Sequence, residues 1–449
     1  MTNEQPPPEV PRESEDKQGG DIWDRWSWAS RAAWSSRMLA ALENGVKGGI
    51  WFSLIDKVWS LKTLFESATK VLDNKGAAGV DHVGVEEFER DLIPNLERLS
   101  SELRAGTYRP QAVRRVNIPK AGSRETRPLG IPTVRDRVVQ GAVRLVLEPI
   151  FEKTFAEQSH GFRPQRGCKD ALRRVDELLK LGYVYVVDAD LKSFFDTIPH
   201  DLLMKQVRTR VADGRVLSLI ESYLTAGILD GLTEWTSEAG APQGAVLSPL
   251  LSNIYLNPLD HLMAAEGWEM VRYADDFVIL CRSAEDAERA LAKVQEWTAS
   301  AKLTLHPTKT RIVDVRTGSF DFLGYSFQSV KDGTVRHWPR KKSLAKLKDT
   351  IRTLTRRTNG HSIERVINDL NPRLRGWLEY FKHSYKTTMD PIDKWIRRRL
   401  RSILRKRLGK RGQSRCFNDH VRWPNSYFDD LGLLNLTAAQ ARARQPRLG

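Results

Sequence analysis

Two adjacent carboxylates, Asp275 and Asp276, stand between apolar residues in the stretch from residue 269 to residue 281. The pattern predicts a strand, an acidic turn and a second strand, which together form a β-hairpin. Like charges this close raise each other's pKa unless cations neutralise them. Mg²⁺ prefers a few carboxylates together with substrate phosphates, and two such ions support phosphoryl transfer. The chemistry that this pair favours is therefore two-metal phosphoryl transfer.

A third carboxylate is expected from a neighbouring strand. The β-prone run at 183–188 leads into Asp188 and Asp190, which lie two residues apart and hence on one face of a strand. Either side chain could complete the site. An Asp-Asp pair alone is weak evidence, because the pair Asp429 and Asp430 fits an ordinary loop. The specificity comes from the spacing, with a Pro-Gln-Gly turn between Asp190 and the hairpin.

The elements that must position these carboxylates mix helices and strands. Helices are expected over 60–110, broken by a turn-rich segment at 74–79, and again over 135–151. A strand is expected at 113–119 and a loop at 127–132. A Gly/Pro turn at 240–244 precedes a long helix that begins after Ser248 and Pro249. The mixture predicts an α+β fold.

The C-terminal part reads as helical after about residue 335. Apolar residues recur at helical spacing in 344–354, 363–370 and 392–408. Residues 331–449 hold 30 basic and 10 acidic side chains, against 42 and 46 in the first 330 residues. This local excess predicts a nucleic-acid-binding region, although a set of solvated helix faces is the alternative. The basic face of the last helix holds Arg397, Arg398, Arg399, Arg401, Arg405, Lys406 and Arg407.

Composition excludes several classes of protein. With 29% charged residues and no apolar run near 18 residues, a membrane-spanning protein is not expected. Three widely separated cysteines cannot form a disulfide framework or a Cys-rich zinc site, which suits a reducing cytosol. Residues 1–20 should be disordered and do not resemble a secretory signal. Six tryptophans between residues 23 and 59 could form a docking surface, but aromatic packing against the core is favoured.

Taken in order, these motifs resemble those of bacterial group II intron-encoded reverse transcriptases, also called maturases. Asn74–Asp81 resembles the N-terminal extension motif of non-retroviral reverse transcriptases. Asp188–Asp196 resembles the first catalytic motif, and Ala241–Ile254 resembles the template- and nucleotide-binding motif. Tyr273–Asp276 has the form typical of group II introns. Further likenesses are Val116–Lys120, Arg127–Pro132, His160–Pro164, Leu303–Thr310, Phe322–Gly324 and, for the maturase thumb, Asn371–Phe381.

The resemblance implies a role for each site residue. Asp190, Asp275 and Asp276 would be the catalytic and metal-binding triad for two Mg²⁺ ions, with Mn²⁺ as a possible substitute. Asp190 is preferred to Asp188 because Phe195 then takes the family's place beneath the incoming sugar, where its ring selects dNTPs. The resemblance implies nucleotide-binding roles for Lys120, Arg127, Phe195, Gln243 and Lys309. The expected primer and template residues are Tyr273 and Gly244, together with residues of the basic helix face that would contact phosphates, namely Arg397, Arg398, Arg401 and Arg405.

Each of these assignments has a plainer alternative. Phe195 fits ordinary core packing, Lys120 and Arg127 fit a solvated loop, and Gln243 fits turn chemistry alone. Lys309 resembles the lysine proposed to protonate pyrophosphate. Tyr273 suits a strand as well as a primer contact.

The implied fold is a right-hand polymerase with fingers and an antiparallel palm, followed by a helical thumb. The expected domains are a disordered tail (1–20), a Trp-rich extension (21–59), fingers and palm (60–330), a thumb or maturase domain (331–412) and a short C-terminal segment (413–449). That last segment is expected to be a DNA-binding remnant or a packed tail. No His/Cys endonuclease domain is expected, because Cys416 stands alone and few residues follow it.

The implied activity is RNA-directed DNA synthesis in a bacterial cytosol or nucleoid, with roles in intron splicing and mobility. The expected partners are intron RNA, a DNA target and primer, and dNTPs, without a membrane, and the protein could be a monomer or a dimer. Two alternatives remain. One is a related reverse transcriptase without an intron, serving phage defence or repair. The other is an RNA-binding splicing factor with a dead polymerase, against which the complete acidic triad argues.

Overall fold

The computed structural model describes residues 21–119, 126–230, 233–235, 239–241, 243–412, 414 and 416–444. The predicted disorder of residues 1–20 and the predicted nucleotide contact of Lys120 lie outside these residues. The protein has an α+β structure, as predicted, and divides into two compact units. None of the described helices is both long and apolar enough to cross a bilayer.

The first unit is formed by the described parts of Met1–Val116, Gly130–Phe155 and Pro199–Tyr255. Its central helix is α7 (Val134–Glu152), which is capped by the Thr133 side chain and buried on most sides. The prediction of a helix over 135–151 is confirmed. The remaining helices are α1 (Ile22–Arg25), α2 (Ser36–Asn44), a 3₁₀ turn (Lys47–Gly49), α3 (Ile55–Val58), α4 (Leu61–Asp73), α5 (Val85–Arg90), α6 (Leu92–Ala105), α10 (His200–Arg208) and α11 (Gly214–Leu224).

The Trp-rich segment packs within this unit. The Trp34 indole is buried, and its Nε1 donates to the carbonyl of Leu145 in α7 at 3.2 Å. The rings of Trp34 and Trp51 meet edge to face at 5.3 Å. The Trp59 ring lies beneath the guanidinium of Arg215. For Trp34 and Trp51 the structure therefore confirms aromatic packing rather than an open docking surface.

A mixed sheet with the strand order β2-β1-β4-β5 contains β1 (Val113–Pro119), β2 (Thr126–Ile131), β4 (Ile228–Asp230) and β5 (Thr233–Trp235). β1 confirms the predicted strand, and it runs parallel to β4 with Val113 opposite Ile228. The prediction of a loop at 127–132 is wrong, because residues through Ile131 belong to β2. β2 is an edge strand, the position in a sheet at which a proline such as Pro128 is tolerated.

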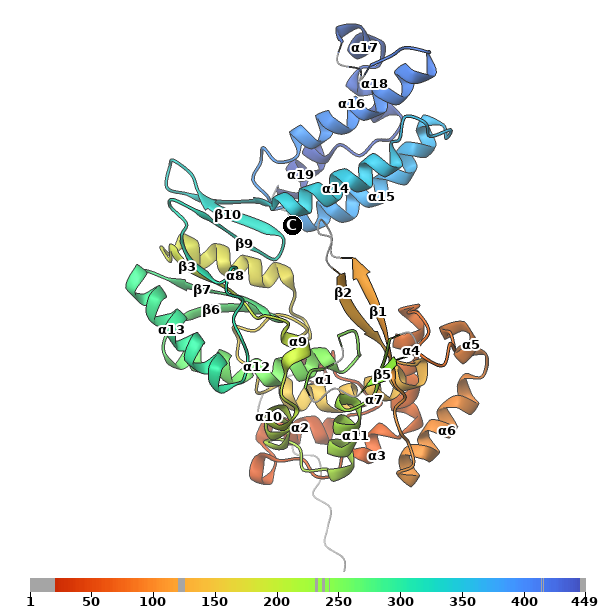
Figure 1. The fold of residues 1–449 in the computed structure, drawn as a ribbon, viewed down its shortest axis with the longest axis vertical. Coiled ribbons are helices and arrows are strands. Elements are labelled where there is room, and N and C mark those ends of the chain that lie inside the picture. Colours follow the sequence, from red (N-terminus) through yellow and green to blue (C-terminus); the bar gives the residue numbers. More distant parts are fainter. Residues whose placement is uncertain are drawn as a thin grey trace, which may run out of the picture. The chain divides into compact units, whose positions relative to one another are not determined.

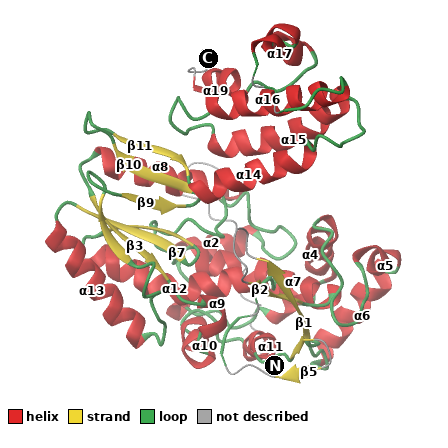
Figure 2. Ribbon diagram, turned by 45° about the horizontal axis from the view of Figure 1, so that its top comes forward, coloured by secondary structure: helices red, strands yellow, loops and turns green. Residues whose placement is uncertain are grey.

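The second unit, formed by the described parts of Asn117–Leu129, Ala156–Ile198 and Leu256–Gly449, is built on an antiparallel sheet. Its strand order is β6-β7-β3-β8, with β3 (Tyr185–Asp190), β6 (Glu269–Tyr273), β7 (Asp276–Cys281) and β8 (Arg311–Asp314). Figures 1 and 2 show α8 (Cys168–Lys180) and α13 (Ala284–Ser300) on opposite sides of this sheet. The predicted hairpin over 269–281 is confirmed.

Side chains alternate between the two faces of this sheet. Val186 and Val278 belong to the same core cluster as the buried face of α8. Val187 and Ile279 have the opposite parity and are equally buried, on the side that α13 covers. The long helix predicted to begin after Ser248 and Pro249 is α12 (Ser248–Ala265).

The C-terminal part continues the core of the second unit. A three-stranded antiparallel sheet of β9 (Ser319–Phe322), β10 (Tyr325–Ser329) and β11 (Val335–Pro339) precedes the helices. The helical pattern expected from about residue 335 therefore begins later, because Val335–Pro339 pairs with β10. The helices are α14 (Lys341–Leu354), α15 (Ile363–Phe381), α16 (Asp390–Arg407), α17 (Phe417–Arg422), α18 (Asn425–Asp430) and α19 (Leu436–Arg444).

Candidate active site

The register of the second unit's sheet brings two of the predicted carboxylates face to face. Asp190, the last residue of β3, lies directly opposite Asp276, the first residue of β7. Directly opposed residues point to the same face of a sheet and have Cβ atoms about 5 Å apart. Asp188 lies on this face as well, opposite Val278. One face of the sheet thus collects three carboxylates at the ends of neighbouring strands.

Asp275 occupies the turn of the hairpin. Tyr273 pairs with Asp276, so Ala274 and Asp275 form a two-residue connection. Ala274 has φ 60°, which non-glycine residues rarely adopt. A positive φ at the first turn residue is what a type II′ hairpin turn requires. The turn therefore presents Asp275 at the tip, next to Asp276.

Burial and mutual repulsion shift the acid–base behaviour of this face. Burial, followed by the nearby charges of Asp188, Asp275 and Asp190, raises the pKa of Asp276 to about 7, although Arg340 opposes the shift. Burial also raises the pKa of Asp188 to about 6, despite the guanidinium of Arg311 at 3.4 Å. The raised pKa values mean that the surrounding protein does not fully stabilise the ionised form of these carboxylates.

A lysine makes contact with the same face. Lys309 Nζ forms an ion pair with Asp190 Oδ2. His306 donates its backbone N–H to the Asp190 carbonyl at 2.7 Å, which holds the 303–310 segment beside β3. The motif lysine and the preferred first carboxylate are therefore brought together.

The donor set fits hard divalent cations, because it is composed of carboxylate oxygens and its raised pKa values favour added positive charge. Among the described residues, however, no three His, Cys, Asp or Glu side chains already converge as metal ligands. One physical reason for this lack of convergence is the ion pair between Asp190 and Lys309, because it draws the carboxylate toward the lysine.

Two other predicted residues lie close to the carboxylates in the sequence. Phe195, in α9 (Phe194–Thr197), is buried, and its ring meets Phe194 edge to face at 5.3 Å. The partly buried Tyr273 ring lies 6.3 Å from Phe162, and burial raises the Tyr273 pKa to about 12. Both rings are packed in ways that their plainer alternatives also predict.

The Pro-Gln-Gly loop belongs to the first unit. The Gln243 carbonyl accepts a hydrogen bond from the Gly130 backbone N–H at 2.7 Å. Gly244 has φ 109°, so a glycine is required there for conformational reasons. Arg127 lies in β2, but its side chain is outside the described residues, as is Lys120.

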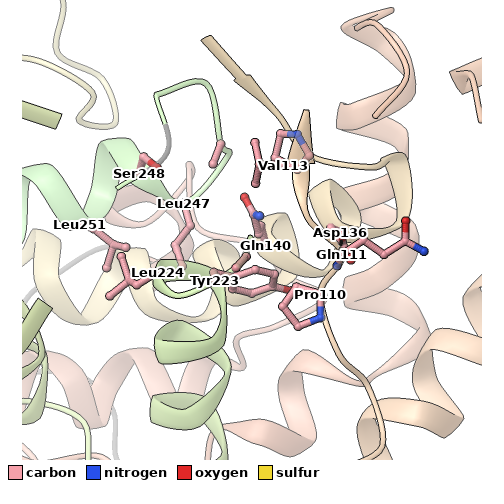
Figure 3. Close-up of a pocket in the computed structure, with 13 residues that line it drawn as sticks. Pro110, Gln111, Val113, Asp136, Gln140, Tyr223, Leu224, Leu247, Ser248 and Leu251 are labelled. Atoms are coloured by element: carbon pink, nitrogen blue, oxygen red, sulfur yellow. Dashed lines mark hydrogen bonds between the residues drawn. The ribbon is translucent and has the colours of Figure 1, made fainter. Parts of the chain in front are cut away.

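A polar side chain that the sequence reasoning missed anchors this loop. Gln140 of α7 is buried, and its Oε1 accepts from the Val246 N–H at 2.9 Å. Figure 3 shows Gln140 projecting into a small pocket near Leu247 and Tyr223. The available signal was a single amide within the apolar run from Val138 to Val143.

The basic face predicted for α16 needs correction. Arg397 and Arg401 are only 7% and 2% exposed, so they do not offer their guanidinium groups to phosphates. Arg401 donates to the Trp423 carbonyl and to Asn425 Oδ1, each at 2.8 Å. The C-terminal segment, whose Trp423, Phe428 and Leu436 enter the core, covers that side of α16. Arg398 and Arg405 stay partly exposed, with Arg405 bonded to Asp419.

Residues 118–327 match the family model "Reverse transcriptase (RNA-dependent DNA polymerase)". Residues 344–421 match the model "Group II intron, maturase-specific domain".

Among curated proteins, "Protein YkfC" of Escherichia coli (strain K12) is 38% identical over 304 residues, covering 58% of this chain and 79% of that protein. "Group II intron-encoded protein LtrA" of Lactococcus lactis subsp. cremoris is 41% identical over 189 residues, covering 42% of this chain. The match spans only 31% of the Lactococcus protein.

Among solved structures, a chain of a "Partial Cas6-RT-Cas1--Cas2 complex" matches with a TM-score of 0.36 at 24% identity, covering 56% of this chain and 43% of that one. A TM-score this low supports no functional inference.

Proposed function

The chain belongs to the group II intron-type reverse transcriptases that carry a maturase domain, and from this premise we propose that Asp190, Asp275 and Asp276 form its polymerase site. The observation that carries the proposal is the register that sets Asp190 opposite Asp276, one residue from the turn residue Asp275. These three carboxylates would hold the two Mg²⁺ ions.

The proposed reaction joins a dNTP to the 3′ end of a primer. The primer 3′-hydroxyl attacks the α-phosphate, the bond to the β-phosphate breaks, and pyrophosphate leaves without a covalent enzyme intermediate. When bound, Mg²⁺ lowers the pKa of the hydroxyl and stabilises the charge on the leaving group. The protein's task is to hold the three carboxylates ionised and in fixed positions on one sheet face.

Asp190 is a better first carboxylate than Asp188. Asp190 lies directly across from Asp276, whereas Asp188 lies two residues further from the hairpin turn and contacts Arg311. We therefore assign Asp188 to tuning the charge of the site rather than to binding the ions.

Lys309 is proposed to act on the leaving pyrophosphate. Its ammonium contacts Asp190, so it stands at the acidic face and can donate a proton or a hydrogen bond there. In the absence of substrate the same ammonium neutralises part of the carboxylate charge. The lysine would exchange its Asp190 contact for a phosphate contact when nucleotide binds.

The remaining nucleotide and template assignments extend this proposal. Phe195 would lie beneath the sugar, Tyr273 beneath the primer terminus, and Lys120, Arg127 and Gln243 around the triphosphate. Gly244 would expose backbone to the template. The corresponding architecture is a right hand, with fingers and palm within 60–330, a thumb or maturase domain within 331–412, a Trp-rich extension at 21–59 and a C-terminal segment from 413.

The proposed partners of the C-terminal helices are the RNA template and the product duplex. The local excess of basic residues supports phosphate binding with little sequence readout. Of the four α16 arginines predicted to contact primer or template, Arg398 and Arg405 retain partial exposure for this role. Roles in splicing and mobility of a group II intron follow from the maturase match and are proposed with it.

Primer extension on poly(rA)/oligo(dT) with Mg²⁺ tests the polymerase site. Wild type should incorporate dTTP, and Asp275→Ala should lose at least about 1000-fold in rate, because one of the proposed metal ligands is gone. Asp430→Ala, in the exposed second Asp-Asp pair, is the matched control and should retain full activity. Equal rates for wild type and Asp275→Ala would refute the assignment.

Splicing of the host intron RNA at low magnesium tests the maturase role separately. The protein should increase the fraction spliced, and Asp275→Ala should do so equally well, since RNA binding does not use the polymerase carboxylates. No protein-dependent gain would refute the maturase role while leaving the polymerase intact.

A further inference from the structure

A fully buried ion pair contacts the hairpin turn that carries Asp275. Arg272 of β6 and Asp260 of α12 are both completely buried. The guanidinium meets the carboxylate in a fork, with Nε to Oδ1 at 2.7 Å and Nη2 to Oδ2 at 2.5 Å. Such a bidentate pair fixes the direction as well as the position of the arginine.

The third nitrogen of the same guanidinium reaches the turn itself. Arg272 Nη1 donates to the Ala274 carbonyl at 2.8 Å. That carbonyl precedes the backbone N of Asp275, so its direction sets the orientation of the peptide that carries the proposed metal ligand. Ala274 has φ 60°, a conformation that its own side chain disfavours and that a neighbouring contact must hold.

The opposite side of β6 is braced by the segment that precedes Phe162. Arg272 N donates to the Gln158 carbonyl at 2.9 Å, and His160 N donates to the Arg272 carbonyl at 2.8 Å. At Gly161 an added Cβ would lie 2.3 Å from Ala274 N and 2.8 Å from the Tyr273 carbonyl carbon. Only a glycine lets these backbones approach so closely.

Stability alone does not account for the ion pair. A buried Arg–Asp pair gains little over apolar residues of the same volume, because desolvation offsets the attraction. What apolar residues could not supply is a donor aimed at one carbonyl of a strained turn. The ion pair therefore serves to select the conformation of the turn and not to bury more apolar surface.

We propose that Arg272, oriented by Asp260, and Gly161 are positioning residues that hold Asp275 in its ligand position for nucleotidyl transfer. The inference rests on the proposed role of Asp275. Arg272 touches neither substrate nor metal in this proposal and acts only through the turn. Displacement of the turn by even about 1 Å would cost about 100-fold in rate.

Steady-state and single-turnover primer extension at 25 °C would test the proposal with four single variants and one double variant. Arg272→Lys keeps the charge but loses the fork, Asp260→Asn keeps the shape but loses the charge, and Gly161→Ala pushes on the turn. Asp393→Asn is the control, because Asp393 is a buried carboxylate of the same unit that accepts from Leu436 N at 3.0 Å, far along the chain from the turn. Circular dichroism and the single-turnover amplitude give the folded, active fraction of each variant.

The expected result is a 30- to 300-fold fall in kcat per active molecule for Arg272→Lys and Gly161→Ala, with KM for dTTP within about threefold of wild type. Asp260→Asn should fall less, because its amide still accepts from one guanidinium nitrogen. Asp393→Asn should keep its kcat. The double variant Arg272→Lys/Gly161→Ala should be far less than multiplicative, because both changes act on one turn.

Three results would overturn the inference. The first is a kcat for Arg272→Lys within threefold of wild type, and the second is an equal loss in Asp393→Asn. The third is a loss that resides only in the amplitude, which would mean a purely structural role. In each of these cases an inactive Asp275→Ala leaves the proposed function standing. A fully active Asp275→Ala would refute the proposed function and this inference together.

Discussion

Removing one hydroxyl from the first unit should cost more stability than removing its neighbour. Tyr108 OH donates to Asp136 Oδ1 at 2.6 Å and lies 2.9 Å from Tyr223 OH. Since Tyr108 donates its proton to the carboxylate, Tyr223 must donate to Tyr108. Asp136 is 1% exposed, and its Oδ2 accepts from Gln111 N at 3.0 Å, just before β1 begins.

The magnitude follows from which groups lose a partner. Tyr108→Phe removes a bond to a buried carboxylate, worth about 2–3 kcal/mol, and leaves the Tyr223 hydroxyl without its acceptor, for about 1 kcal/mol more. Tyr223→Phe removes only the outer donor and should cost about 1 kcal/mol. The free energy of unfolding should thus fall about threefold more for Tyr108→Phe.

The loss should also depend on pH. Burial raises the pKa of Asp136, and the bond from Tyr108 opposes that rise. Without the bond the pKa of the folded state rises further, so the folded variant holds its proton to higher pH than the wild type does. The destabilisation by Tyr108→Phe should therefore grow as the pH rises through that range, and shrink in acid.

Urea unfolding followed by circular dichroism measures both effects, with the transition of the first unit identified by protection of α7 amides in hydrogen exchange. Primer-extension rates per folded molecule should stay near wild type. Equal losses in the two variants, or a larger loss in Tyr223→Phe, would show that the direction of the hydrogen-bond chain has been read wrongly.

Three further predictions concern other sites. Burial lowers the pKa of His160 to about 4, so the unfolded chain binds the proton at a higher pH than the folded chain does. The free energy of unfolding should therefore fall between about pH 6.5 and 4, by up to about 3 kcal/mol. The urea midpoint of His160→Gln should lack this pH dependence, and parallel pH profiles of the variant and the wild type would contradict the prediction. Gln140→Leu leaves the Val246 N–H unpaired, so KM for dTTP should rise several-fold at unchanged folding, and an unchanged KM would count against the loop anchor. Gly79→Ala would place a Cβ 2.6 Å from Thr133 Cα, so thermal unfolding should show a loss of about 2 kcal/mol or more, which a neutral result would disprove.

The acidic hairpin was predictable because its information is local. Short apolar runs flank Asp275 and Asp276, and the structure forms β6 and β7 at those positions. Local sequence could not decide between Asp188 and Asp190 in this way, because both side chains lie on the same face of β3. Only the register between β3 and β7, which depends on residues far apart in the chain, shows which one opposes Asp276.

Where prediction failed, distant partners decide the outcome. Helical spacing placed Arg397 and Arg401 on an outer face, but residues after 416 fold back over α16 and bury them. No periodicity within one helix can reveal that cover. Arg272 was equally hidden, because its meaning depends on Asp260, twelve residues earlier on another element. An arginine inside an apolar strand was the visible signal.

The register of β3 also limits how this protein can change in length. Asp188 and Asp190 face the site only because β3 keeps step with β7 from Tyr185 to Asp190. Loss of one residue within that stretch would turn either carboxylate toward the α13 side and put an apolar side chain in its place. The turn at Gly182, where φ is 86° and an added Cβ would meet no atom within 4 Å, precedes the paired residues and can absorb an insertion without moving them. Length variation among descendants of this chain should therefore collect before β3, whereas within it only substitutions can persist.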